Sequence, residues 1–226
     1  MAVLILARHA ETAVIGKKLT GRITGVHLTA NGRVQAMALA DKLINVKIGA
    51  IFSSPLERAM ETAKPLSDAL GIPVSPHNGL NEVNFGAWQG RPYRQLEKLK
   101  LWRAIQRTPS LVTFPAGESF VTAQQRIVAS LEEIASAMEE NDTAVCFSHC
   151  DPIKLALAYF LNMALDDFQR ISIEPASLSL VILGKGIPRL GSINQSVSEN
   201  DFFMKLAKRE NESANLEDNH APTQML

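Results

Sequence analysis

Residues 2–9, Ala2-Val3-Leu4-Ile5-Leu6-Ala7-Arg8-His9, join an unbroken apolar run directly to an arginine and a histidine. The run over residues 3–7 is typical of a strand that is buried on both faces of a sheet. Residues 143–149, Thr143-Ala144-Val145-Cys146-Phe147-Ser148-His149, form a second β-rich run that ends in a histidine. Ligands of an open parallel sheet bind at the carboxyl ends of its strands. We therefore expect His9 and His149 to lie on the same rim.

Helices and strands alternate along the rest of the chain. The spacing of apolar residues predicts helices over 29–44, 56–70, 94–106, 119–138 and 153–161, and strands over 50–53, 73–75 and 177–183. Thr29, Ser54 and Asp151 are expected to cap three of these helices, and Pro65 to kink or break the second. The alternation predicts an α/β fold with a mainly parallel sheet.

Composition limits the kinds of partner. The chain has 226 residues, and its 23 basic residues balance its 23 acidic ones, so no overall field attracts nucleic acid or a membrane. Its two cysteines make no disulfide framework, so we expect a reducing cytoplasm. We expect one domain over 1–195 with an insertion at about 84–118, and a polar, weakly ordered tail over 196–226.

Local positive charge gathers near the histidines. Arg8 precedes His9, and Arg58 stands in the first turn of the helix after the strand at 50–53. With a protonated His149, these side chains would offset the charge of a phosphomonoester, about −1.5 to −2. Arg58 has an alternative as a solvated helix residue paired with a nearby carboxylate. The helix after His149 adds backbone N–H groups at the same rim.

Seven segments resemble the histidine phosphatase superfamily, the group that includes cofactor-dependent phosphoglycerate mutase. They occur in the family's order over most of the chain, and they are Arg8-His9-Ala10-Glu11-Thr12, Thr20-Gly21-Arg22, Leu28-Thr29-x-x-Gly32, Ser53-Ser54-Pro55-Leu56-x-Arg58-Ala59-x-x-Thr62-Ala63, Leu80-x-Glu82-x-x-Phe85-Gly86-x-Trp88-x-Gly90, Phe114-Pro115-x-Gly117-Glu118-Ser119 and Ser148-His149. The resemblance implies a three-layer α/β/α sandwich with a mainly parallel central sheet.

The resemblance also implies a mechanism. His9 would attack phosphorus and form a phosphohistidine, and Glu82 would protonate the leaving alcohol, although a plain loop carboxylate remains an alternative for it. The other residues implied to bind the phosphate or the substrate are Arg8, Arg58, His149, Thr20, Gly21, Arg22 and Cys150. Neither a metal nor a cofactor is implied.

The chain departs from the family after both histidines, where Ala10 and Cys150 replace the usual glycines. Both are small, so we expect a narrowed site. Cys150 is either a packing residue or a redox-sensitive thiol at a helix N-terminus. A zinc site at Cys146, His149 and Cys150 is disfavoured, because alternate side chains of a strand point to opposite faces.

Three functions remain open. A phosphatase acting on a small phosphorylated metabolite is favoured, because Glu11-Thr12-Ala13-Val14-Ile15 lacks the Trp and Asn that usually follow in the family's mutases. The alternatives are a phosphomutase of the phosphoglycerate mutase type and a catalytically weak phospho-ligand binding protein. Trp88, Tyr93 and Trp102 in the insertion either line the site or form the insertion's own core. No nucleic-acid or membrane partner is expected, and a homo-oligomer is left open.

Overall fold

The computed structural model describes residues 1–139 and 142–197, and residues 140–141 and 198–226 lie outside the description. The expected weakly ordered tail therefore falls almost entirely outside the described residues. The histidines, the arginines and the insertion all lie within them.

The described residues form a six-stranded sheet in the order β3-β2-β4-β1-β5-β6. Its strands are β1 Ala2–Arg8, β2 Ala50–Ser53, β3 Val74–Pro76, β4 Thr143–Ser148, β5 Leu178–Leu183 and β6 Arg189–Gln195. The pairs β2–β3, β2–β4 and β1–β4 are parallel, whereas β5 runs antiparallel to β1 and to β6. The sheet is mostly parallel, as predicted.

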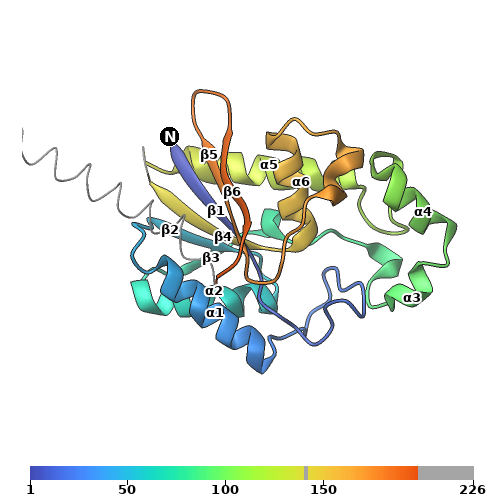
Figure 1. The fold of residues 1–226 in the computed structure, drawn as a ribbon, viewed down its shortest axis with the longest axis horizontal. Helices are drawn as coiled ribbons and strands as arrows, with labels where there is room; N and C mark the ends of the chain where they lie inside the picture. Colours follow the sequence, from blue (N-terminus) through green and yellow to red (C-terminus); the bar gives the residue numbers. More distant parts are fainter. Residues whose placement is uncertain (140–141, 198–226) are drawn as a thin grey trace, which may run out of the picture.

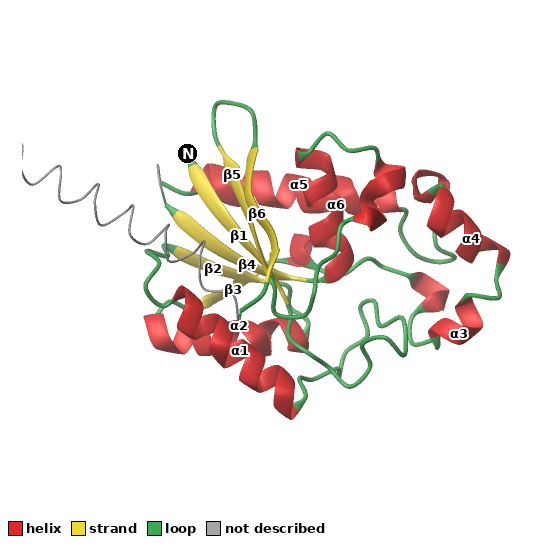
Figure 2. Ribbon diagram, viewed as in Figure 1, coloured by secondary structure: helices red, strands yellow, loops and turns green. Residues whose placement is uncertain are grey.

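Helices cover both faces of the sheet and give a three-layer sandwich (Figures 1 and 2). The helices are α1 Ala30–Leu43, α2 Glu57–Leu70, α3 Tyr93–Leu96, α4 Lys100–Arg107, α5 Phe120–Ala137 and α6 Cys150–Phe160. Alternate side chains of β1 enter two cores: Ile5 and Ala7 pack with α1 and α2, while Leu4 and Leu6 pack with α5 and α6. The predicted three-layer fold is confirmed.

The two central strands bring the two histidines together. β1 and β4 pair in register, with Arg8 opposite Ser148, so both strands end at the same edge. The backbone N–H of His9 donates to the carbonyl of Ser148 at 3.0 Å. The expectation that His9 and His149 share one rim is confirmed.

Three predicted helix features are wrong. α6 begins at Cys150 with His149 at its N-cap, so Asp151 lies in the first turn and does not cap the helix. Ser54 does not cap α2, because the N-cap residue is Leu56, two residues further on; the Ser54 hydroxyl bonds to Asn81 and His149 and accepts a long bond, 3.4 Å, from the N–H of Leu56. Of the kink or break expected at Pro65, the break is wrong, because α2 is continuous from Glu57 to Leu70. A proline removes only the one backbone bond to the carbonyl four residues earlier, so the rest of the helix remains.

The insertion and the last strand also differ from the prediction. The helix expected over 94–106 is two helices, α3 and α4, because the backbone of Leu99 is extended and starts a second helix. β6 was not predicted. Its residues alternate between exposed and half-buried, and many of them are polar, so the strand shows no apolar pattern in the sequence.

Candidate active site

His9 is a buried, neutral imidazole with one free nitrogen. Its side chain is 5% exposed, and Nδ1 lies 2.8 Å from the carbonyl oxygen of Ala10. A carbonyl only accepts, so Nδ1 carries the proton and Nε2 keeps its lone pair. Burial, and then the charges of Arg58 and Arg8, hold the pKa of His9 well below its usual value. The ring is therefore in the form that a nucleophile requires.

Two arginines beside His9 keep unsatisfied N–H groups. Arg58 is 2% exposed; its Nη2 donates to the carbonyl of Gly21 at 2.7 Å, and its Nη1 has no partner among the described residues. Arg8 donates through Nη1 to the carbonyl of Ile173, while its buried Nε is unpartnered within the same residues. Buried donors without acceptors are costly, and an anion bound between them would satisfy both.

His149 belongs to a chain of hydrogen bonds. Ser54 Oγ donates to Asn81 Oδ1 at 2.9 Å, so its single proton is used and His149 Nε2 must donate to Ser54 at 2.8 Å. The rings of His149 and His9 have centroids 5.2 Å apart. Burial, followed by Arg58 and His9, lowers the pKa of His149. His149 is therefore neutral in the site without a ligand, and its protonated form, which was predicted for the phosphate-bound site, stays a prediction.

Glu82 is held as an uncharged acid. Its side chain is nearly buried, and Oε1 accepts from the N–H of Val83 at 2.9 Å. Burial, reinforced by the negative charge of Asp151, raises the pKa of Glu82 to about 8. A carboxyl group that keeps its proton at neutral pH is suited to general acid chemistry.

A half-buried ion-pair cluster supports the loop that carries Glu82. Glu118 Oε1 accepts from Arg22 Nη2 at 3.0 Å, from Arg126 Nη2 at 2.7 Å and from the N–H of Asn84 at 2.8 Å. Arg22 Nε donates to the carbonyl of Glu82 at 2.8 Å. Arg22 was predicted to bind substrate, but its side chain bonds to Glu118 and to the carbonyl of Glu82 and does not line the cavity. Neither Arg126 nor a role for Glu118 was found from the sequence.

A cavity of about 240 Å³ brings most of the predicted residues together. The predicted residues that line it are Arg8, His9, Thr20, Gly21, Arg58, Glu82 and Cys150. His149 is fully buried and is not part of the lining, nor is Arg22. The lining also includes Tyr93, which the sequence analysis left between the site and the insertion's core, and Lys18, Asp151 and Lys154, which it did not assign to the site. Asp151 and Lys154 are three residues apart in α6, and this spacing in the sequence already indicated that the two side chains are neighbours on the helix surface.

Ala10 and Cys150, which replace the family's glycines, fit their positions without backbone strain. Neither Ala10 nor Cys150 has a positive φ. The N–H of Ala10 donates to Thr62 Oγ1 at 3.0 Å. Burial raises the pKa of the Cys150 thiol to about 11, and its Sγ lies 3.7 Å from the carbonyl of Ile173. A raised pKa disfavours the reactive thiolate, so Cys150 fits the packing role.

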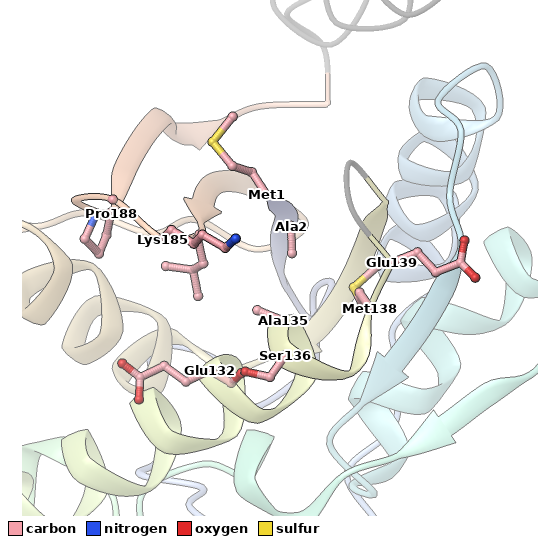
Figure 3. Close-up of a pocket in the computed structure, with 12 residues that line it drawn as sticks. Met1, Ala2, Glu132, Ala135, Ser136, Met138, Glu139, Lys185 and Pro188 are labelled. Atoms are coloured by element: carbon pink, nitrogen blue, oxygen red, sulfur yellow. The ribbon is translucent and has the colours of Figure 1, made fainter.

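A larger cavity, of about 660 Å³, lies at the opposite end of the sheet (Figure 3). It is bordered by Met1 and Ala2 at the start of β1, by the end of α5 and by the turn between β5 and β6. Its charged residues are Glu132, Glu139 and Lys185, and it contains neither histidine nor arginine. None of the site residues predicted from the sequence lines it, so the candidate active site is the smaller cavity.

The fold is α/β, and the candidate site places a neutral imidazole beside two arginines whose buried N–H groups have no partner among the described residues. The sequence profile of the histidine phosphatase superfamily (branch 1) matches residues 4–196, and the chain belongs to that superfamily. None of the described helices is long and apolar enough to cross a membrane.

Relatives include both phosphatases and mutases. Phosphoserine phosphatase 1 of Hydrogenobacter thermophilus is 28% identical over 213 residues, which is 92% of this chain and 99% of the relative. The 2,3-bisphosphoglycerate-dependent phosphoglycerate mutase of Thermoplasma acidophilum is 31% identical over 205 residues, 90% of this chain and 98% of the relative. The solved structure of Bacillus stearothermophilus YhfR superposes with a TM-score of 0.82 at 25% identity, and the match covers 88% of this chain and all of that one.

Proposed function

We propose that the protein is a metal-independent phosphomonoesterase that works in the cytoplasm on a small phosphorylated metabolite through a phosphohistidine on His9. One observation carries the proposal. The bond from Nδ1 to the carbonyl of Ala10 leaves Nε2 of His9 with a lone pair, in a cavity that also holds unpartnered N–H groups of Arg8 and Arg58. No nucleic-acid or membrane partner is part of the proposal.

In the first step His9 replaces the alcohol at phosphorus. The lone pair of Nε2 forms the N–P bond while the ester P–O bond breaks, and the proton of Glu82 passes to the leaving oxygen. Arg8 and Arg58 bind the phosphoryl oxygens, where negative charge is concentrated. His149 and Ser54 lie next to His9, and a phosphoryl group there favours the protonated form of His149.

In the second step water replaces His9. The Glu82 carboxylate takes a proton from the water, the new P–O bond forms, and the N–P bond breaks to return the lone pair to Nε2. Inorganic phosphate leaves, and Glu82 is again protonated and His9 neutral. The two steps return every group to its starting state without a metal.

The named relatives keep a mutase as the second candidate. The Thermoplasma acidophilum relative carries that name at 31% identity, so a transfer of the phosphoryl group back to the substrate has to be measured. With 3-phosphoglycerate and a trace of 2,3-bisphosphoglycerate, a phosphatase releases inorganic phosphate. A mutase instead accumulates 2-phosphoglycerate.

Hydrolysis of 4-nitrophenyl phosphate in excess EDTA tests the proposal. We expect turnover by the wild type, no turnover by His9→Ala, and wild-type turnover by His27→Ala. His27 is a matched control because its ring binds Glu61 and does not line the cavity. Absence of turnover by the wild type, or full activity of His9→Ala, would overturn the proposal.

A further inference from the structure

A third cavity, of about 150 Å³, adjoins the catalytic one. We call it the annex cavity. It shares five lining residues with the catalytic cavity, namely Leu19, Phe85, Tyr93, Asp151 and Lys154. Since the same side chains border both spaces, the two cavities are neighbours, and the annex cavity is the space next to the position that a phosphate beside His9 would occupy.

The rest of the annex lining is mainly aromatic. Trp88 and Trp102 stack with ring centroids 6.5 Å apart, and Tyr93 meets Trp102 edge-on at 6.0 Å. Ile105, Phe114 and Phe120 continue the apolar wall. Trp102 and Ile105 belong to α4, so the insertion supplies much of the annex cavity.

Charge in the annex cavity is balanced. Its charged residues are Asp151 and Lys154, both of which also border the catalytic cavity, and its other polar residues include the uncharged Gln106 and Gln169. No arginine lines it. A second phosphate or a carboxylate placed among the aromatic rings would lose hydration without gaining a net positive partner. An apolar group would lose little and gain burial.

We propose that the annex cavity binds an aromatic or apolar part of the alcohol, so that the substrate class is the phosphomonoester of a ring-bearing alcohol. This proposal rests on the proposed phosphatase function. Size agrees with it, because an apolar cavity of about 150 Å³ is known to accept one benzene molecule. The sequence analysis left two alternatives for the two tryptophans and Tyr93, lining the site or forming the insertion's core. In this proposal they contact the substrate.

The test compares 2-phenylethyl phosphate with ethyl phosphate. Both are phosphates of primary alcohols, and they differ in the ring alone. Burial of a phenyl group predicts a kcat/KM roughly 10- to 100-fold higher for the phenylethyl ester. Equal values for the two esters in the wild type would overturn the proposal.

Three variants on α4 locate the effect. Trp102→Ala removes part of the wall, and Gln106→Phe places a new ring in the cavity from an exposed position, so each lowers the preference for the phenylethyl ester. Arg103 is exposed on the same helix and outside both linings, so Arg103→Ala keeps the wild-type preference. An unchanged preference in correctly folded Gln106→Phe contradicts the assignment.

Binding can be read without turnover. The chain has two tryptophans, and both line the annex cavity. In His9→Ala, 2-phenylethyl phosphate should change the tryptophan emission, and ethyl phosphate should leave it unaltered. If no ester is hydrolysed by the wild type, the phosphatase proposal fails while this measurement still decides the annex cavity. Equal emission changes with both esters, or none with either, would reject it.

Discussion

Single residues set the chemistry through their burial. His9 is neutral because burial and two adjacent arginines oppose its protonation, and Glu82 is protonated because burial opposes its ionisation. The same physical cause thus leaves one group able to donate electrons and the other able to donate a proton. Neither protonation state can be read from residue type or spacing.

The pH profile should follow Glu82. Its pKa of about 8 keeps the acid form up to that pH, so kcat/KM for ethyl phosphate should fall as the pH rises through about 8. Glu82→Gln should be slow throughout and lack this alkaline limb. A Glu82→Gln profile that retains the limb would assign it to another group.

Stability should respond to the same residue with a definite sign. The pKa of Glu82 is raised on folding, so the unfolded chain loses its proton near pH 4.5 while the folded chain keeps it to about 8. The carboxyl group therefore destabilises the fold progressively as the pH rises across that window. Thermal denaturation of Glu82→Gln should show a gain in Tm over the wild type that is larger at pH 8 than at pH 5. A gain independent of pH would contradict the raised pKa.

At the scale of elements, the ion-pair cluster of Glu118, Arg22 and Arg126 holds the Glu82 loop against α5. Removing Glu118 from this half-buried cluster leaves Arg22, Arg126 and the N–H of Asn84 without their shared acceptor. We expect Glu118→Ala to lower the free energy of unfolding by about 2–4 kcal/mol in urea titrations. Asp68 pairs with Lys64 on the exposed face of α2, so Asp68→Ala should cost less than about 1 kcal/mol. Equal losses in the two variants would show that the cluster adds no support.

Elements with strong local signals were predictable, and those defined by distant contacts were not. β1 and β4 are continuous apolar runs, and Thr29 caps α1 through a bond to the N–H of Gly32 at 2.9 Å. Serine commonly caps helices, but the hydroxyl of Ser54 bonds to Asn81 and His149, which are distant in the sequence. β6 is half-exposed and polar, so its pairing with β5 left no apolar pattern.

For the whole molecule, the neutral net charge conceals a local anion site. The proposed catalytic groups come from the end of β1, α2, the Glu82 loop and the start of α6, so a phosphate bound beside His9 would contact four separate segments of the chain. The family and most of its site residues were accessible from motif order. The annex cavity could not be predicted from the sequence, because its aromatic residues are far apart in the chain and come together only in the folded structure.

Phosphate should therefore stabilise the folded chain as a whole. A ligand that binds the native state at 100 times its Kd contributes about 2.7 kcal/mol. We expect inorganic phosphate to raise the Tm of the wild type and to have little effect on the Tm of Arg58→Met. Without phosphate, the Tm of Arg58→Met should not fall far below that of the wild type, because Arg58 Nη1 is buried without a partner among the described residues. An equal phosphate effect in both proteins would place the anion elsewhere.

Trapping of the covalent intermediate tests the central claim most directly. Wild-type protein mixed with a phosphorus-labelled ester and quenched in base within one turnover should carry an acid-labile label on the peptide that contains His9, and His9→Ala should carry none. Label on another residue, or turnover by the wild type with no labelled protein at any quench time, would contradict nucleophilic attack by His9.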